Sequence, residues 1–170
     1  MHRAFLSLGS NLGNRIFNLQ KALELISKHI GDIKSVGALY ETEPWGFDSD
    51  NWFVNTAIEF DTIHSPRELL HKCMWIENIL GRERNKTKEG YSSRLIDIDI
   101  LFYDDKIINS PDIIIPHLYV HKRKFVLAPL NDIAPELIHP ILKESVQTLF
   151  LSCLDKTKLI KMDLQLEIIS

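Results

Sequence analysis

The chain has 170 residues, 45% of them hydrophobic, and its 20 basic and 23 acidic residues give a formal net charge of -3. This size suits one compact domain with a sizeable core, so we expect a single domain spanning residues 1–170. The negative balance argues against a broad nucleic-acid-binding surface. No apolar run approaches the roughly 20 residues of a membrane span, and residues 1–11 turn polar too early for a signal peptide. Cys73 and Cys153 lie far apart in apolar surroundings, which is typical of buried thiols in a reducing compartment, so we expect a soluble cytoplasmic protein.

The N-terminal part alternates between strand and helix patterns. Residues 3–8 predict a strand, and the glycine-containing residues 9–13 predict a turn. Apolar residues recur at spacings of three and four from Ile16 to Ile30, which predicts a helix capped by Gly31. A second strand is predicted over residues 33–41.

The next segment repeats this order. Residues 53–61 alternate as a strand in which Phe53 and Asn55 share the polar face. Residues 65–68 form a capping box with proline at the first helical position, and they predict a helix that continues to Gly81. A further strand is predicted over residues 95–103.

The predicted order is β-α-β-β-α-β, with one apolar stripe on each helix and one apolar face on each strand. We therefore expect an α+β fold, a ferredoxin-like antiparallel sheet with both helices packed on one face and the other face left for function. The last third predicts a C-terminal extension of short strands and helices. Its elements are an extended run halted by Pro116, helices over 121–133 and 144–154, and a strand over 159–162.

The strand over residues 95–103 carries two carboxylates inside an apolar run. Side chains alternate along a strand, so Asp97 and Asp99 share one face. The opposite face is predicted to hold Ile96, Ile98, Ile100 and Phe102. Like charges on neighbouring positions repel, and such a pair invites a divalent cation, magnesium rather than zinc because the ligands are oxygens. Taken alone, the pair also fits an ordinary solvated sheet face.

A basic loop precedes the two aspartates. Residues 82–94 contain Arg82, Arg84, Lys86, Lys88 and Arg94 against only two glutamates. A basic loop that leads into an acidic strand favours binding of a magnesium-bound polyphosphate. The usual glycine-rich phosphate-binding patterns are absent from the chain, so a nucleotide would be held in another way.

Several other side chains are suited to a flat polar ligand. Asn55 offers donors and an acceptor, and Trp45, Trp52, Phe53 and Phe125 offer aromatic surface. Each of these has a plain alternative as a surface amide or a core aromatic. His117 and Arg123 likewise read alone as a structural histidine and a solvated arginine.

Taken together, these segments resemble the 6-hydroxymethyl-7,8-dihydropterin pyrophosphokinase family of folate biosynthesis. The resemblance covers roughly residues 3–140, in order. It is carried by GSNLG, YETEPWG, FVN, IENILGRER, SRLIDIDILFYD, and IPH followed by RKFVLAPLNDIAPEL. Members of this family transfer the terminal diphosphate of ATP to the pterin hydroxymethyl oxygen and leave AMP. The resemblance therefore implies an ATP-dependent diphosphotransferase that uses ATP, a dihydropterin and two Mg²⁺ ions, as a monomer without nucleic-acid or membrane partners.

The resemblance also implies roles for individual residues. Asp97 and Asp99 would hold the metal ions, and Arg82 and Arg94 would assist the transfer. The residues implied to serve ATP are Glu77, Arg84, Ile100, His117 and Arg123. Those implied to bind the pterin are Thr42, Pro44, Trp45, Phe53, Asn55 and Phe125.

Some positions depart from the family pattern. These are Phe53, Met74, Asp112 and the segment KEGYSS ahead of Arg94, and the loop is about two residues longer than the commonest form. The departures bear on ATP affinity and loop closure.

Two other readings of the same element order remain open from the residues. An RNA-recognition domain needs a basic sheet and a characteristic aromatic signature, whereas the corresponding strand reads WFVNTAIEF in an acidic chain. A small-molecule regulatory domain would explain the sheet but not the paired aspartates beside an arginine-rich loop.

Overall fold

The computed structural model describes residues 1–44, 50–81 and 95–169. In chain order, these residues form β1 (His2–Ser10), α1 (Arg15–His29), β2 (Gly31–Val36), β3 (Tyr40–Thr42), β4 (Phe53–Thr62), α2 (Pro66–Ile79), β5 (Asp97–Tyr103), β6 (Ile108–Asn109), β7 (Ile114–Ile115), a 3₁₀ turn (Val120–Lys122), α3 (Lys124–Ile133), α4 (Val146–Ser152) and β8 (Leu159–Lys161). In the part of the chain that the structure describes, no helix is long and apolar enough to cross a bilayer.

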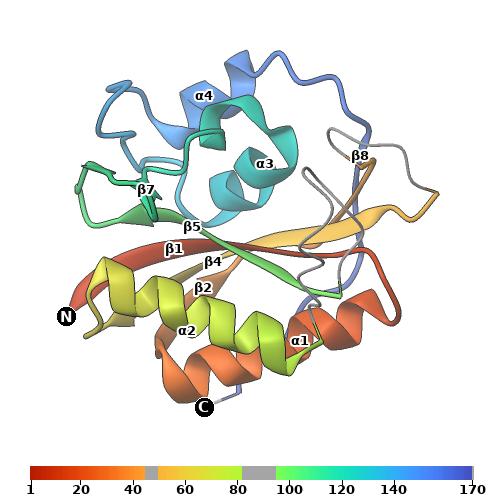
Figure 1. The fold of residues 1–170 in the computed structure, drawn as a ribbon. Coiled ribbons are helices and arrows are strands. Elements are labelled where there is room, and N and C mark those ends of the chain that lie inside the picture. The colour runs from red at the N-terminus through yellow and green to blue at the C-terminus, as the bar shows by residue number, and fades with distance from the viewer. Residues whose placement is uncertain (45–49, 82–94, 170) are drawn as a thin grey trace.

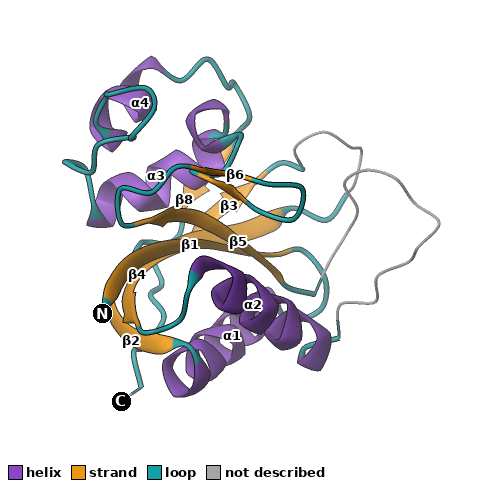
Figure 2. Ribbon diagram, turned by 60° about the vertical axis from the view of Figure 1, so that its left-hand side comes forward, coloured by secondary structure: helices purple, strands orange, loops and turns teal. Residues whose placement is uncertain are grey.

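Six of the described strands build one antiparallel sheet with helices on both sides. The order across the sheet is β5, β1, β4, β3 and β8, and β2 pairs with β4 beside β3. Strands β6 and β7 form a separate two-stranded ribbon. Helices α1 and α2 lie together on one face, and α3 and α4 lie over the opposite face (Figures 1 and 2). The expected α+β fold with an antiparallel sheet is confirmed.

Each face of the sheet carries its own apolar core. The larger core joins β1, β4 and β5 to the buried stripes of α1 and α2, exemplified by Leu23 and Ile76. The second core joins Phe5 and Ala57 to α3 and α4. The expectation that the second face is left entirely for function is therefore wrong, because α3 and α4 cover one end of it. The other end stays polar.

A β-bulge in β5 overturns one expectation about its faces. Phe5 pairs with Phe102 but Leu6 pairs with Ile100, so Leu101 is an extra residue in the ladder. An extra residue shifts the alternation by one. Phe102 therefore packs in the second core with Phe5, on the face opposite Ile100, and its predicted place beside Ile98 and Ile100 is wrong.

The predicted strand over residues 33–41 is two strands. Between β2 and β3, the N–H of Gly37 still donates to the carbonyl of Ala57 at 2.8 Å. The N–H of Ala38 then turns to the carboxylate of Asp132 on α3. The carbonyl of Leu39 accepts from Met162. Contacts with distant segments thus interrupt the ladder.

Gly31 begins β2 and is not a left-handed helix cap as predicted, because the helix is capped by Ile30. A Cβ at Gly31 would lie 2.1 Å from the carbonyl oxygen of Asp61 on β4. Glycine is therefore needed here for the close approach of two strands. At α2 the predicted capping box is present, formed by Ser65 and Glu68.

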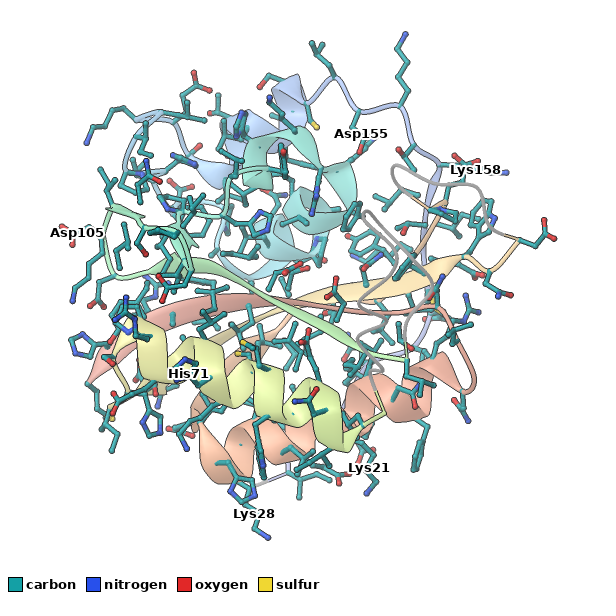
Figure 3. The ribbon with its side chains drawn as sticks, viewed as in Figure 1. Lys21, Lys28, His71, Asp105, Asp155 and Lys158 are labelled. Atoms are coloured by element: carbon teal, nitrogen blue, oxygen red, sulfur yellow. The ribbon has the colours of Figure 1, made fainter. Side chains whose placement is uncertain are left out.

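The C-terminal segment completes the sheet and then crosses α1. The predicted final strand is β8, which pairs with β3. Beyond it, Leu166 is buried in the larger core, and Gln20 and Glu167 exchange two hydrogen bonds at 2.9 and 3.0 Å. Figure 3 shows Lys158 on the same side of the sheet as Asp155, whereas the labelled lysines of α1 lie below the sheet.

The last two helices are shorter than expected. The helix predicted over residues 121–133 is split into the 3₁₀ turn and α3, because Arg123 has an extended backbone. The helix predicted over 144–154 is α4, capped by the hydroxyl of Ser145. Cys73 is buried as expected, but Cys153 is only half-buried, and both are free thiols.

Candidate functional site

At the polar end of the sheet face that carries α3 and α4, the strand register places a predicted pterin-binding residue in line with a predicted metal ligand. Gly9 on β1 pairs with Asn55 of β4 on one side and with Asp97 of β5 on the other. Two residues along β1, Ser7 lies between Ala57 and Asp99. Because neighbouring strands are about 4.8 Å apart, Asn55 and Asp97 are separated by roughly 10 Å across the sheet. This spacing would allow a small ligand to contact both side chains across β1.

The aspartate pair has the donor chemistry of a magnesium site. Asp97 and Asp99 are both half-buried and project to the same face of β5. Among the described residues, no group of three or more histidine, cysteine, aspartate or glutamate side chains converges. Two carboxylates that leave room for water and phosphate oxygens fit Mg²⁺, which keeps several such ligands. They do not fit a closed zinc site.

Asn55 lies in a slot over Gly9, where a larger residue would collide with its side chain. It is 4% exposed, and its Nδ2 donates to Oγ1 of Thr42 on β3 at 2.8 Å. A Cβ at Gly9 would lie 2.5 Å from Oδ1 of Asn55. The absence of a side chain at Gly9 thus lets the amide fold over β1. A buried amide held by one neighbour keeps further donor and acceptor capacity for a polar heterocycle.

The predicted pterin-binding residues gather around this slot in part. Phe53 begins β4, pairs with Thr42 and approaches Gly9 on the same face as Asn55. Pro44 follows β3 and is half-buried. Phe125 lies in the first turn of α3, at the margin of the second core. Trp45 is outside the described residues.

A pocket of about 280 Å³ opens at the outer edge of β5. It contains Asp99, Ile100 and His117, so the structure brings together one metal candidate and two residues predicted to serve ATP. The rest of its lining was not predicted from the sequence. Ile98 comes from β5, and the other residues come from α2, the β6–β7 ribbon and the segment after it: Leu70, Pro111, Ile113, Ile114, Leu118 and Tyr119. The run of isoleucines before Pro116 was the available signal.

Asp112, one of the positions that depart from the family pattern, also lines this pocket. Its carboxylate accepts from Ser110 and lies 3.1 Å from Nε of Arg67. These contacts hold the pKa of Asp112 below its ordinary value, the hydrogen bond from Ser110 being the larger cause. The negative charge at the rim is therefore partly balanced by the protein itself.

His117 is fixed against β5. Its backbone N–H donates to the carbonyl of Leu101, the bulged residue, at 3.0 Å. Its Nδ1 accepts from the N–H of Tyr119 at 3.2 Å, which leaves Nε2 as the protonated nitrogen of the neutral ring. Burial lowers the pKa of His117, and the charge of Asp97 offsets part of this effect. The neutral ring can donate one hydrogen bond from Nε2.

Arg123 is buried, with 4% of its surface exposed. Its guanidinium lies over the ring of Tyr119 at 4.8 Å and near that of Phe125 at 5.9 Å. Burial lowers its pKa to about 10, so the group stays charged at neutral pH. A buried cation beside two aromatic rings is well suited to an anionic ligand.

Glu77 does not itself line this pocket. It lies on the buried side of α2, and its Oε1 accepts from the N–H of Ile98, a lining residue, at 2.9 Å. The three predicted arginines of the loop, Arg82, Arg84 and Arg94, fall outside the described residues.

A larger pocket of about 590 Å³ contains one of the candidate aromatic residues, Trp52, and none of the residues to which the resemblance gives a role. It is lined by Asn11, Leu12, Gly13, Arg15, Glu41, Asp50, Asn51, Trp52 and Ile160. Within it, Arg15 donates to Glu41 at 3.1 Å and to the carbonyl of Trp52 at 2.9 Å. These contacts tie α1 to the segment before β4, and the pocket is separate from the aspartate pair.

Comparisons with known proteins identify the family. The sequence model of the family described as 7,8-dihydro-6-hydroxymethylpterin-pyrophosphokinase (HPPK) matches residues 5–135. A 2-amino-4-hydroxy-6-hydroxymethyldihydropteridine pyrophosphokinase of Methylorubrum extorquens is 40% identical over 139 residues, which cover 81% of this chain and 86% of the relative. The protein of the same name from Porphyromonas gingivalis is 41% identical over 137 residues, 80% of this chain and 92% of the relative.

Longer proteins are similar over one part of their length. The folic acid synthesis protein fol1 of Pneumocystis carinii is 40% identical over 151 residues, covering 89% of this chain but 20% of the relative. Among solved structures, wild-type Plasmodium falciparum HPPK-DHPS with pteroate has a TM-score of 0.73 at 19% identity, covering 88% of this chain and 44% of that one. This chain thus spans less than half of that structure, and the likeness shows a shared fold. By its match to the family and to two relatives of similar length, the chain belongs to the 7,8-dihydro-6-hydroxymethylpterin pyrophosphokinase family.

Proposed function

We propose that this chain transfers a diphosphate from ATP to the hydroxymethyl group of 6-hydroxymethyl-7,8-dihydropterin and releases AMP, a step of folate biosynthesis. Family membership supports the reaction. The observation that carries it to these residues is the register of three strands, in which Asn55, Gly9 and Asp97 form one row. A pterin held at Asn55 would have its hydroxymethyl arm directed toward phosphates held at the aspartate pair.

The aspartates and their metal form the centre of the proposed site. Asp97 and Asp99 would hold two Mg²⁺ ions, which when bound neutralise phosphate charge and orient the diphosphate. Asp99 also lines the pocket at the edge of β5, so a nucleotide bound there would present its phosphates to the same carboxylates.

The ATP subsite is proposed to be this pocket and its surroundings. Its apolar walls suit a base, with Ile100 on one side, while Nε2 of His117 and the charged Arg123 would donate to phosphate or ribose oxygens. Arg84 would contact the phosphates. Glu77, also expected to serve ATP, accepts a hydrogen bond from the backbone N–H of Ile98, which lines the same pocket.

The pterin subsite is proposed to be the slot at the end of β3 and β4. Asn55 and Thr42 would read the polar edge of the ring, with backbone contacts from Pro44 and Trp45. Phe53 and Phe125 would lie against its two faces, as aromatic rings do around flat ligands.

In the proposed reaction, the hydroxymethyl oxygen attacks the β-phosphorus of ATP as the bond from that phosphorus to the α-phosphate oxygen breaks. The proton of the hydroxyl leaves to solvent or to phosphate, and AMP departs with the bonding pair. The chain supplies position and charge in such transfers rather than a covalent intermediate. Arg82 and Arg94 would stabilise the charge that develops on the moving diphosphate.

Five further features are proposed with this function. The β-α-β-β-α-β part is proposed to be ferredoxin-like, which the strand order β5, β1, β4 with β2 and β3 at the far side supports. The rest would be a C-terminal extension. The chain is proposed to act as one domain over residues 1–170, as a monomer, in the cytoplasm.

The test is AMP release from MgATP by the purified chain, with and without the dihydropterin. The proposal predicts AMP formation only when the pterin is present, and its loss in Asp97→Asn. The RNA-binding alternative predicts no AMP under any condition, and a regulatory domain predicts ligand binding without turnover.

A further inference from the structure

Glu77 sits where a charged side chain is least expected. It belongs to the buried side of α2, beside Cys73 and Ile76, and is 2% exposed. An apolar residue at this position would continue the stripe at no desolvation cost, whereas a buried carboxylate must be compensated by hydrogen bonds. Glu77 therefore needs hydrogen-bond partners that offset the cost of removing its carboxylate from water.

One such partner is the outer edge of β5, the strand that carries Asp97 and Asp99. β5 pairs with β1 alone among the described strands, so its outer edge presents backbone groups to α2 and to the segment around His117. Oε1 of Glu77 accepts from the N–H of Ile98 at 2.9 Å. The N–H of His117 donates to the carbonyl of Leu101 further along the same strand. The outer edge of β5 therefore makes hydrogen bonds at two points, Ile98 and Leu101.

The first of these points lies between the two proposed metal ligands. Ile98 separates Asp97 from Asp99, and its side chain is buried in the larger core while theirs face the site. Holding the Ile98 peptide fixes the rotation of β5 about its own axis. That rotation decides whether both carboxylates point to the same side at a fixed separation.

Cys73, one turn before Glu77 on α2, lies near carboxylates from both α2 and β5. Burial raises the pKa of the Cys73 thiol, and the charges of Glu77 and Asp99 both add to this rise. Cys73 therefore lies within Coulombic range of Glu77 on its own helix and of Asp99 on β5.

We propose that Glu77 is a positioning residue for the metal site, acting through the Ile98 peptide rather than through contact with ATP. This role rests on the proposed function, since it concerns the metal that the reaction needs. Residues that orient metal ligands typically change metal affinity or activity by about 10- to 100-fold when they are lost.

The test uses Glu77→Leu, which fills the space without an acceptor, and Glu77→Gln, which keeps an acceptor oxygen. Ile76→Val is the matched control, because Ile76 is buried on the same helix turn and carries no polar group. Three readouts are compared: Mn²⁺ affinity by electron paramagnetic resonance with α,β-methylene-ATP present, amide hydrogen exchange at Ile98, and the Mg²⁺ concentration that gives half-maximal AMP release.

Glu77→Leu is expected to weaken Mn²⁺ binding and raise the half-maximal Mg²⁺ concentration by at least about 10-fold, with faster exchange at Ile98. Glu77→Gln should restore most of both, and Ile76→Val should change thermal stability alone. Unchanged metal binding in a folded Glu77→Leu protein would overturn the proposal, as would an equal change in Ile76→Val. If the wild-type chain releases no AMP, the proposed function fails, but Mn²⁺ affinity and exchange at Ile98 still decide the role of Glu77. Should Glu77→Leu not fold, Glu77→Ala and Glu77→Gln are compared by the same readouts.

Discussion

Gly9 and Asn55 face each other across β1 and β4 so closely that a Cβ at Gly9 would lie 2.5 Å from the amide oxygen of Asn55. The Asn55 side chain could not easily move away from such a Cβ, because it is buried and donates a hydrogen bond to Thr42. The shape of the proposed pterin slot therefore depends on one missing side chain.

Gly9→Ala is expected to displace the Asn55 amide and so weaken pterin binding by up to about 1 to 3 kcal/mol, the cost of leaving a buried polar group without its partner. Asn55→Ala should weaken it by a similar amount, about 1 to 3 kcal/mol, because a polar edge of the ligand loses its partner. Calorimetric titration with the pterin and with α,β-methylene-ATP measures both. ATP binding should change little in either variant.

The double variant provides the control. Because the clash at Gly9 is with the side chain of Asn55, adding Gly9→Ala to Asn55→Ala should cost almost nothing further. Additive losses would show that Gly9 acts on the slot in another way, and equal losses for both ligands would remove Asn55 as the pterin-binding residue.

Asp97→Ala and Asp99→Ala are each expected to abolish turnover while the chain stays folded. The proposed metal supplies several kcal/mol of charge stabilisation, and both side chains are half-buried on the polar end of the sheet rather than in a core. Initial rates over a range of Mg²⁺ concentrations and circular dichroism check the two halves. Near-normal rates at ordinary Mg²⁺ in either variant would contradict the assignment.

Arg94→Ala is expected to slow the chemical step by about 10³- to 10⁵-fold with only few-fold changes in the Kd of MgATP and pterin, and Arg82→Ala to act in the same direction. The reason is that an arginine used in the transition state contributes little to ground-state binding. Single-turnover rates beside equilibrium Kd values separate this from simple attraction. A large, salt-sensitive change in Kd with an unchanged chemical step would favour attraction instead.

The protein is expected to lose stability in acid because of two histidines, His121 and His139. Burial lowers the pKa of His139 and of His121, and the charge of Lys122 adds to the effect at His121. His139 is also held as an acceptor, because its Nδ1 accepts from the N–H groups of Ile141 and Leu142. A folded-state pKa below the unfolded value means that the unfolded chain takes up protons first, so stability is full above about pH 6.5 and falls as pH drops below it.

Urea unfolding at pH 7.5 and pH 5 measures this loss, at about 1.4 kcal/mol for each unit by which a pKa is lowered. His139→Asn keeps an acceptor without the titrating ring and should flatten the pH dependence. His71→Gln, at an exposed position of α2, should leave it unchanged. A wild-type chain equally stable at both pH values would contradict the account.

The sequence pattern was sufficient for elements whose residues determine them locally. The capping box at Ser65 and the stripe through Leu69 and Ile76 specify α2 without distant help. The shared face of Asp97 and Asp99 follows from alternation alone.

Features set by distant partners could not be read this way. The bulge at Leu101 depends on its partners in β1 and on His117, and it moved Phe102 to the other core. The break before β3 depends on Asp132 of α3. The contact of Glu77 with Ile98 joins residues that are 21 positions apart, so no local spacing signals it.

The most direct test of the central claim follows two phosphorus labels through the reaction. Two preparations of ATP are used, one labelled at the β-phosphorus and one at the γ-phosphorus. Diphosphate transfer predicts that each label appears in the pterin product and that AMP carries neither. Label transfer from the γ-position alone, with ADP as the other product, would contradict the account.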